Sequence, residues 1–297
     1  MTTPFHGLSA FPITPMDTEG RVQIDALQGL VARLAAAGVD SIGLLGSTGS
    51  YMYLTRSERA RALSAALEVA GNVPVIVGVG ALRTDEAVAL AREAAQLGAT
   101  AGLLAPVSYT PLTQDEVFDH FATVAREGGL PLVIYDNPGT THFRFAPALI
   151  KRLAELPGIV AVKNPTDDPS AIAPHLASQR AELPDAFSIG YSGDWNASRA
   201  LLDGADAWYS VLAGILPAPC LRLTRAAQRG DRGKVAAVEA QLAPLWALFR
   251  QHSSYRVVHA MARMQGLIRT DPPAPMKPLP SSVETVIADA IGALAFD

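Results

Sequence analysis

The amino-acid sequence predicts an α/β protein built as a (β/α)8 barrel, with a helical subdomain following it. Three observations lead to this fold: short apolar runs typical of buried strands recur eight times, segments with helical spacing separate them, and no strand follows the eighth run. The connections are short, which favours a closed barrel of parallel strands. The predicted strands are Leu8 to Phe11, Ser41 to Leu45, Pro74 to Val79, Ala101 to Ala105, Pro131 to Tyr135, Ile159 to Lys163, Ala186 to Tyr191 and Asp206 to Val211.

The segments between the strands carry the start and stop signals of helices. Thr55, with Glu58 three residues later, predicts a capping box, and Thr84, Thr113 and Asp194 stand where N-caps are expected. Glycines close several helical segments just before the next strand begins. A doubly wound sheet is the alternative fold, but it needs a nucleotide-binding fingerprint, and the stretch 78–83 lacks its third glycine.

The pattern changes after the eighth strand. Helical segments follow at about 218–229, 233–251 and 254–267, and a Pro-rich run at 271–280 leads to a last helix at about 282–294. We therefore predict two domains, a catalytic barrel over residues 1–230 and a helical subdomain over residues 231–297. The Pro-rich run is short and is expected to be an ordered connector.

Composition excludes several classes of function. The chain of 297 residues is 49% hydrophobic and 18% charged, which is ample for a large core, and its formal net charge is −4 without a basic block. Nucleic acid and membrane surfaces are therefore not expected as partners. The first residues lack the pattern of a signal peptide, and the single Cys220 has neither a disulfide partner nor a metal-ligand partner. These features predict a cytoplasmic protein.

Lys163 is one of only four lysines, and it alone ends a buried strand, with the turn at Pro165 close behind it. Burying an ammonium group without a partner is costly. The functional interpretation is an amine that attacks a carbonyl to form a Schiff base. The structural interpretation is a lysine that extends to water or pairs with a carboxylate. Because active sites of such barrels gather at the carboxyl ends of the strands, the other strand ends decide between the two.

Several other strand ends carry polar side chains suited to a small site. Strand two ends in Gly46-Ser47-Thr48-Gly49, whose backbone N–H and hydroxyl groups could hold a carboxylate, although a tight turn with solvated hydroxyls has the same sequence pattern. Strand five ends at Tyr135, either a proton carrier or a core ring. Tyr109 follows strand four in a loop, and Asp194 after strand seven is interpreted first as an N-cap and second as a partner for substrate hydroxyls.

In this order the motifs resemble those of the class I pyruvate-dependent aldolases and lyases, the family that includes dihydrodipicolinate synthase and N-acetylneuraminate lyase. Residues 46–49 resemble its GTTG or GSTG carboxylate loop, and Tyr135 with Asn137-Pro138 resembles its YNxP tyrosine. Lys163 with Thr166 resembles its strand-ending lysine in a KxxT context. The resemblance covers essentially the whole chain, including the helical C-terminal part.

The resemblance implies a mechanism and an assembly. Lys163 would form an imine with pyruvate or a related 2-oxo acid, and Ser47 and Thr48 would hold the carboxylate. Tyr135 would act as general acid and base, with Ser47 and Tyr109 completing a proton relay. The family supplies this last tyrosine from a neighbouring subunit, which implies a homotetramer built from dimers. Neither a cofactor nor a metal is expected, and the remaining expected substrate contacts are Gly46, Thr140, Thr166, Asp194 and Ser210.

The departures from the family pattern fall on the side of the second substrate. Thr140 stands where the synthases carry an arginine for the distal carboxylate of aspartate semialdehyde, and a threonine makes no charged bidentate contact. Ser50 and Asn164 replace two glutamates, and Asp136 replaces an asparagine. Arg144 offers a charge nearby, although a surface helix cap is the favoured role for it.

The sequence thus predicts a Schiff-base lyase or aldolase that joins or separates pyruvate and an aldehyde, and that is not a true dihydrodipicolinate synthase. Two alternatives stay open. One is a dehydratase of a deoxy-keto-sugar acid that uses the same imine. The other is a non-catalytic family member that binds 2-oxo acids.

Overall fold

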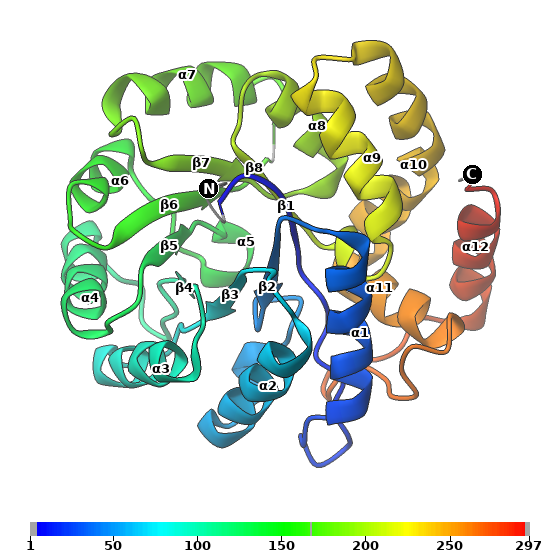
Figure 1. Cartoon of the computed structure of the whole chain (residues 1–297), viewed down its shortest axis with the longest axis horizontal. Coiled ribbons are helices and arrows are strands. Elements are labelled where there is room, and N and C mark those ends of the chain that lie inside the picture. The colour runs from blue at the N-terminus through cyan, green and yellow to red at the C-terminus, as the bar shows by residue number, and fades with distance from the viewer. Residues whose placement is uncertain (1–4, 167, 295–297) are drawn as a thin grey trace.

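A computed structural model gives the structure of the chain and describes residues 5–166 and 168–294. The first four residues, where no signal peptide is expected, and the last three of the predicted subdomain lie outside the described residues. Eight parallel strands form a closed barrel in sequence order, surrounded by helices (Figure 1). The strands are β1 (Gly7–Ala10), β2 (Ser41–Leu44), β3 (Val75–Gly78), β4 (Ala101–Leu104), β5 (Leu132–Tyr135), β6 (Ile159–Asn164), β7 (Ser188–Tyr191) and β8 (Ala207–Ser210). The predicted fold class and all eight predicted strands are confirmed.

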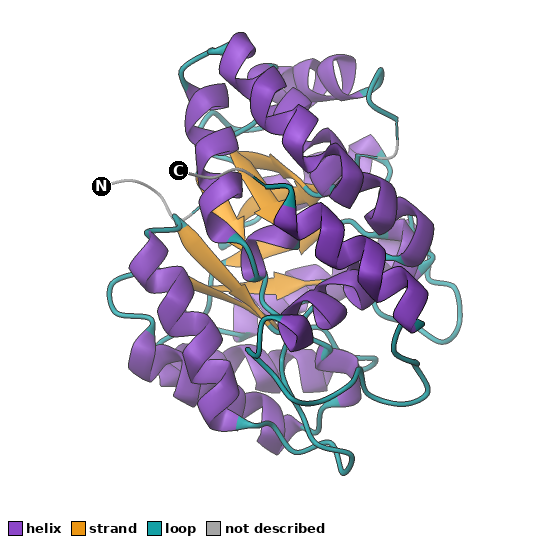
Figure 2. Ribbon diagram, turned by 90° about the vertical axis from the view of Figure 1, so that its right-hand side faces the viewer, coloured by secondary structure: helices purple, strands orange, loops and turns teal. Residues whose placement is uncertain are grey.

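A helix follows each strand and covers the outside of the barrel, as a side view shows (Figure 2). These helices are α1 (Ile24–Ala37), α2 (Arg56–Val69), α3 (Thr84–Leu97), α4 (Gln114–Glu127), α6 (Pro147–Ala154), α7 (Ile172–Glu182), α8 (Asp194–Leu202) and α9 (Pro217–Gln228). The single-turn α5 (Pro138–Thr141) and the 3₁₀ turns η1 (Tyr51–Tyr53) and η2 (Leu212–Gly214) lie in the loops that follow β5, β2 and β8.

The helix starts agree only in part with the predicted caps. Thr55 accepts a hydrogen bond from the Glu58 backbone N–H, and the complete capping box occurs instead at Thr113. Thr84 is the first residue of α3 rather than its N-cap, which is Arg83, and the Thr84 hydroxyl is hydrogen-bonded to a ring nitrogen of His120, 2.9 Å away. The predicted cap at Asp194 is also wrong: Gly193 is the N-cap of α8, and the carboxylate of Asp194 is used elsewhere.

Two layers of buried side chains hold the barrel together. The larger layer lies between the strands and the surrounding helices and explains why the strands are apolar on both faces. The smaller cluster fills the barrel itself, as expected for a packed barrel core. It consists of Phe11, Ile76, Ala101, Leu103, Ala105, Val133, Tyr135, Ala161, Ala207 and Tyr209.

The C-terminal part is helical, as predicted, and packs on one side of the barrel (Figure 1). It contains α10 (Arg232–His252), α11 (Ser254–Met264) and α12 (Ser281–Gly292). Helix α10 packs against α8 and α9, and α12 packs against α10 and α11. The proposed division of the chain at residue 230 stays a prediction. In the described part of the chain, no helix combines the length and apolar character required to cross a membrane.

Candidate active site

Lys163 lies near the end of β6, directly beside Tyr135 of β5 in the strand register. Its side chain is 5% exposed, and its Nζ lies 4.2 Å from the ring centroids of Phe11 and Tyr135 and 5.8 Å from that of Tyr209. Among the described residues, Nζ has no carboxylate within ion-pair distance. The contacts with aromatic faces offset part of the cost of burying the charge, but they do not replace an ion pair. This arrangement does not fit the interpretation of Lys163 as a member of a structural ion pair.

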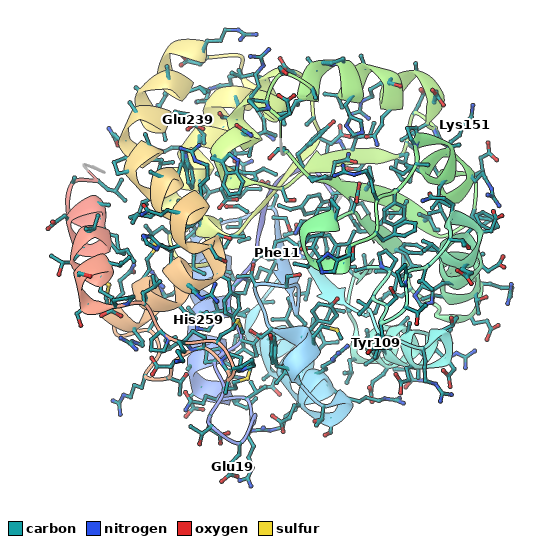
Figure 3. The ribbon with its side chains drawn as sticks, turned by 180° about the vertical axis from the view of Figure 1, so that it is seen from behind. Phe11, Glu19, Tyr109, Lys151, Glu239 and His259 are labelled. Atoms are coloured by element: carbon teal, nitrogen blue, oxygen red, sulfur yellow. The ribbon has the colours of Figure 1, made fainter. Side chains whose placement is uncertain are left out.

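Glycines make room for the aromatic ring that lies next to Lys163. Phe11 is located near the centre of the barrel (Figure 3). A Cβ atom at Gly43 would overlap the Phe11 ring, and one at Gly46 would lie 2.9 Å from Cδ1 of the same ring. Gly46, expected to bind substrate, is absent from the lining of the cavity described below. Its position indicates a different role, which is to leave space for the Phe11 ring.

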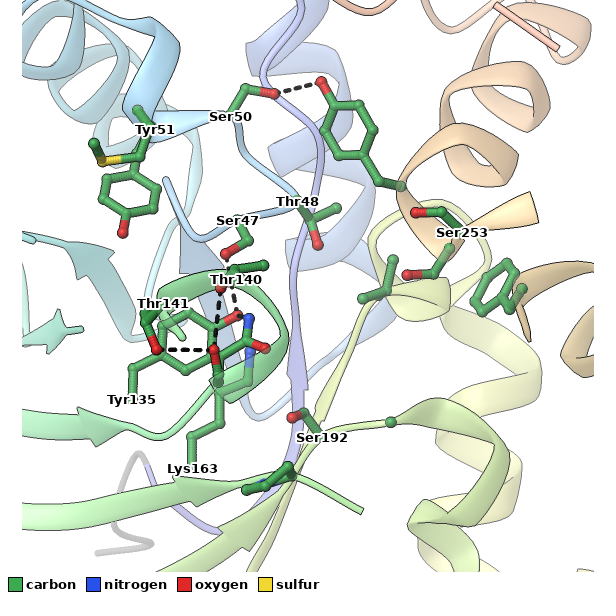
Figure 4. Close-up of a pocket in the computed structure, with 18 of the residues that line it drawn as sticks. Ser47, Thr48, Ser50, Tyr51, Tyr135, Thr140, Thr141, Lys163, Ser192 and Ser253 are labelled. Carbon is green, nitrogen blue, oxygen red and sulfur yellow. Dashed lines mark hydrogen bonds between the residues drawn. The ribbon is translucent and has the colours of Figure 1, made fainter. Parts of the chain in front are cut away.

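Tyr135 takes part in a chain of hydrogen bonds that leads away from Lys163 (Figure 4). Its hydroxyl donates to Oγ of Ser47 at 3.2 Å and accepts from Nδ2 of Asn137 at 2.7 Å. The Tyr135–Ser47 contact agrees with the first step of the expected relay. Asn137 was noted only as part of a motif, and its contact with the phenol was missed. Its spacing of two residues from Tyr135 was the available signal, because such residues project to the same side of an extended chain.

The loop after β2 is folded back sharply. A Cβ atom at Gly49 would lie 2.9 Å from Cα of Leu45, so only glycine fits this turn. The N–H groups of Ser47 and Thr48 reach no acceptor among the described residues, and both side chains line the cavity. Free amides beside hydroxyl groups form a suitable site for a carboxylate.

Strained backbone is concentrated around this loop and across the cavity from it. In the described part of the chain, the non-glycine residues with φ in the left-handed region are Leu45, Ser50, His142 and Ser253. Ser50 and Ser253 line the cavity, and His142 follows the lining residue Thr141. Such conformations cost about 1–3 kcal/mol each and persist where the surrounding structure enforces them, often at functional sites.

A cavity of about 520 Å³ connects these elements. One wall consists of strand ends and their loops, including Ser47, Thr48, Tyr135 and Lys163. The opposite wall comes from the C-terminal helices and the Pro-rich connector, and consists of Phe249, Ser253, Ser254, Tyr255, Arg256 and Met276. The size is within the range of about 300–1,000 Å³ found for pockets that hold drug-sized ligands. The cavity therefore has room for more than a three-carbon acid.

Two tyrosines in the lining are held in the neutral state. Burial raises the pKa of Tyr51 well above its usual value, with a further contribution from the nearby Tyr135 and an opposing one from Arg59. Burial also raises the pKa of Tyr255 to about 12, although its hydrogen bond with Ser50 opposes the shift. The Ser50 Oγ and Tyr255 Oη atoms are 2.8 Å apart, so this contact ties the loop after β2 to α11.

Asp194 and Ser210, both expected to bind substrate, face each other inside the protein. Asp194 accepts hydrogen bonds from Trp208 Nε1 at 3.0 Å and from the Leu212 N–H at 2.6 Å, and Ser210 Oγ donates to it at 3.3 Å. Burial raises the pKa of the Asp194 carboxyl, while these hydrogen bonds lower it. Asp194 reaches the cavity lining, but Ser210 is fully buried and does not. The geometry indicates that this pair holds the loop after β8.

The two threonines expected to contact substrate both line the cavity. The hydroxyl of Thr140 donates to the Asn137 carbonyl at 3.3 Å, and that of Thr166 donates to the Ser192 carbonyl at 2.6 Å. Position 193 accommodates only glycine, because a Cβ atom on Gly193 would overlap the hydroxyl of Thr166. The Thr166 hydroxyl proton is thus already used to join the loops after β6 and β7.

Tyr109 is 97% exposed and lies away from the barrel centre (Figure 3). It does not line the cavity of its own chain. Within one chain the structure therefore joins Tyr135 to Ser47 but does not bring Tyr109 to them. Such exposure is what a tyrosine acting on a neighbouring subunit would have.

The positions that depart from the family pattern have varied surroundings. Asn164 is fully buried and forms two side-chain hydrogen bonds with Gln179, at 2.9 and 3.2 Å. Arg144 is not a helix cap, because α6 begins at Pro147 with Ala146 as its N-cap. It lines a separate cavity of about 330 Å³ between α6 and α7.

Within residues 5–166 and 168–294, no three His, Cys, Asp or Glu side chains gather in a way that could hold a metal ion.

Comparisons with known proteins agree with this architecture. The model of the dihydrodipicolinate synthetase family matches residues 4–294. The 4-hydroxy-tetrahydrodipicolinate synthases of Methylococcus capsulatus and Rhodospirillum centenum are 33% and 34% identical, over 94% and 97% of both chains respectively. The crystal structure of dihydrodipicolinate synthase from Agrobacterium tumefaciens has a TM-score of 0.97 at 53% identity, covering 99% of each chain. That of the Aquifex aeolicus enzyme has a TM-score of 0.89 at 28% identity, covering 97% of each chain.

Proposed function

We propose that this chain, which belongs to the dihydrodipicolinate synthetase family, makes or breaks a C–C bond between pyruvate and an aldehyde through an imine on Lys163. Membership of the family makes the chain a lyase. The imine, the residues that serve it and the nature of the aldehyde are the proposal. The observation that carries it is a buried lysine amine that contacts aromatic rings, has no carboxylate partner in the described part of the chain and lies beside the Tyr135–Ser47 hydrogen bond.

In the cleavage direction, the neutral amine of Lys163 attacks C2 of a 4-hydroxy-2-oxo acid, and water leaves as the imine forms. The protonated imine withdraws electrons, so the C3–C4 bond breaks as a base removes the proton of the C4 hydroxyl. The aldehyde departs and leaves an enamine. Protonation at C3 and hydrolysis then release pyruvate and restore the amine. All atoms and electrons are accounted for without an external oxidant or reductant.

The surrounding residues have roles that follow from their positions. Tyr135 is adjacent to Lys163 in the strand register, and its hydroxyl exchanges protons with the C4 oxygen. Ser47 accepts a hydrogen bond from the Tyr135 hydroxyl and can pass a proton onward. The free N–H groups and hydroxyls of Ser47 and Thr48 hold the C1 carboxylate, which fixes C2 against the amine.

We assign the last member of the relay to Tyr109 of a neighbouring subunit, in a tetramer built from dimers. Its exposure in the single chain supports this assignment. Sedimentation of a fully active enzyme as a monomer under assay conditions would remove Tyr109 from the mechanism.

Aspartate semialdehyde is not our proposed second substrate. Thr140 lines the cavity at the position where the synthases carry an arginine, and its neutral hydroxyl cannot replace a bidentate guanidinium contact.

A dehydratase on the same imine is the second candidate, favoured by the many hydroxyl groups of the cavity lining. In that reaction C3 loses a proton and the enamine expels the C4 hydroxyl, which leaves as water after protonation. The C3–C4 bond survives, so the two reactions give different products from one substrate.

The test is a panel of 4-hydroxy-2-oxo acids of increasing length, with product analysis for pyruvate and for the dehydrated 2-oxo acid. Aldolase activity predicts steady pyruvate release that disappears in Lys163→Arg and persists in Lys151→Arg, a matched change on the surface. Release of water without pyruvate would replace the aldolase by the dehydratase. Tight binding of 2-oxo acids without either product would identify a non-catalytic member of the family.

A further inference from the structure

Charge is distributed unevenly over the lining of the main cavity. Its basic side chains are Lys163 and Arg256, and its acidic side chain is Asp194. The Asp194 carboxylate is already saturated by the hydrogen bonds that hold the loop after β8. In the described lining, the part of the cavity away from Lys163 thus owes its positive charge to Arg256.

Arg256 is half-buried in the first turn of α11, and no acceptor or carboxylate among the described residues engages its guanidinium group. A second arginine on the same helix shows the usual alternative. Arg263 pairs with both Asp271 and Glu284. An arginine at the wall of a cavity, without a partner among the described residues, presents five N–H donors to whatever enters.

The segment that carries Arg256 is fixed in place against the catalytic loop. Ser253, which precedes α11, lies across the pocket from Tyr135 and Lys163 (Figure 4) and has φ of 71°. Tyr255 is hydrogen-bonded to Ser50 at 2.8 Å. A strained junction held by a hydrogen bond across the cavity is a rigid support for the guanidinium group.

We propose that Arg256 binds a carboxylate at the far end of the substrate, so that the enzyme acts on 2-oxo acids with a second, distal carboxylate. This inference rests on the proposed function, because it assumes that the near end of the substrate is held at Lys163. A dicarboxylate with its 2-oxo group joined to Lys163 meets the protonated imine at one end and the guanidinium at the other. The planar guanidinium matches one carboxylate bidentately.

The same assignment explains how Thr140 can be tolerated. Thr140 and Arg256 line one cavity from different elements, the short α5 and the C-terminal α11. The charge that Thr140 cannot supply thus enters from the opposite wall of the cavity. Arg256 can therefore bind a distal carboxylate, whereas an aldehyde whose carboxylate requires a charged partner at residue 140 is not bound.

Calorimetric titration with paired 2-oxo acids tests the proposal. The pairs are 2-oxoglutarate against 2-oxopentanoate and 2-oxoadipate against 2-oxohexanoate, which match in chain length and differ in the distal carboxylate. We expect the natural protein to prefer at least one dicarboxylate by about 10- to 100-fold, the range for hydrogen bonds to a charged group. Arg256→Leu and Arg256→Gln should abolish that preference, and Arg256→Lys should keep part of it.

Arg250→Leu is the matched control, since it removes the same charge from an exposed position on α10 outside the lining. It should keep the full preference. An equal affinity for both members of each pair in the natural protein, no binding of either dicarboxylate, or a preference that survives Arg256→Leu would each overturn the proposal. If the preference depends on Arg256 but no 2-oxo acid is turned over in the panel above, the lyase proposal fails and the distal site stands.

Discussion

The two walls of the cavity are built differently. In the wall at the strand ends, the register of β5 and β6 places Lys163 and Tyr135 side by side. Tyr135 also belongs to the packed core of the barrel. The opposite wall comes from the C-terminal helices and the Pro-rich connector, and the contact between Tyr255 of α11 and Ser50 joins it to the loop after β2. Lys163 and Tyr135 in the first wall are fixed by backbone ladders, whereas side chains of the second wall depend on how separate elements pack together.

This difference suggests a division of tasks. The barrel wall carries the groups that we propose bind and convert the 2-oxo acid, and such groups need fixed geometry. The C-terminal wall carries hydroxyls and an arginine, which can change without disturbing a strand. A family can therefore keep its chemistry and alter its second substrate by changing the C-terminal wall. Substitutions on the first wall should alter turnover most, and those on the second should alter selectivity or stability.

Replacing Lys163 should give the largest effect. Lys163→Met should reduce turnover by at least about 10⁴-fold, because no imine can form. It should not lower the thermal midpoint, since methionine removes a buried polar amine that has no ion-pair partner in the described structure. Turnover and differential scanning calorimetry on the same sample check both statements. A stable but active variant would contradict the first, and a clearly destabilised one would assign Lys163 a structural role.

Removing the Tyr135 hydroxyl should have the second largest effect. Tyr135→Phe should lower kcat by about 10²- to 10⁴-fold, the usual contribution of general acid–base catalysis. Formation of the imine should persist. Tyr191→Phe removes a buried phenol that contacts His175 instead, at 2.9 Å, and should leave kcat within a few-fold of the natural value. A kcat for Tyr135→Phe equal to that of this control would exclude the proton-transfer role.

The C-terminal wall should be sensitive to acid. His259 packs against Tyr255 with ring centroids 4.6 Å apart and the rings tilted by 45°, and burial lowers its pKa to about 4, with Asp271 opposing the shift. The unfolded chain has the ordinary histidine pKa of about 6.5 and so binds a proton first as the pH falls. The contribution of neutral His259 to the free energy of unfolding is therefore fully present above about pH 6.5 and is lost on acidification towards pH 4.

His259→Phe should remove this pH dependence, which amounts to about 2–3 kcal/mol between pH 7 and pH 4. Urea unfolding at a series of pH values measures it. Parallel curves for the natural protein and the variant would show that His259 does not titrate between these limits.

A steric change behind the barrel wall, at the contact with Phe11, should give a smaller effect. Gly46→Ala should cost about 1–3 kcal/mol of stability, because the new methyl group would press on the Phe11 ring. Gly29→Ala is the control: nothing lies within 4 Å of a Cβ atom there, and alanine in the middle of α1 should stabilise by about 0.5–1 kcal/mol. Urea unfolding distinguishes the two, and equal stabilities would show that the Phe11 contact relaxes freely.

The barrel and its strand ends were predictable because they follow from local patterns. Lys163 and Tyr135 end apolar runs, and parallel strands bring such ends to one face of a barrel. The sequence could not reveal that Asp194 is used by the loop after β8, since its partners lie 14 to 18 residues further along the chain. Arg256 was missed for a related reason. Its position in the cavity depends on the packing of α11 over the barrel, which leaves no periodic signal.

The most direct test of the account is the site of imine formation. The natural protein is treated with pyruvate and borohydride, digested, and examined by mass spectrometry. We expect one reduced pyruvyl group, located on Lys163, and the same adduct in Arg256→Leu because the two walls act separately. A protein left unlabelled, or labelled at Lys151, Lys234 or Lys277 instead, would contradict the assignment of the chemistry to the barrel wall.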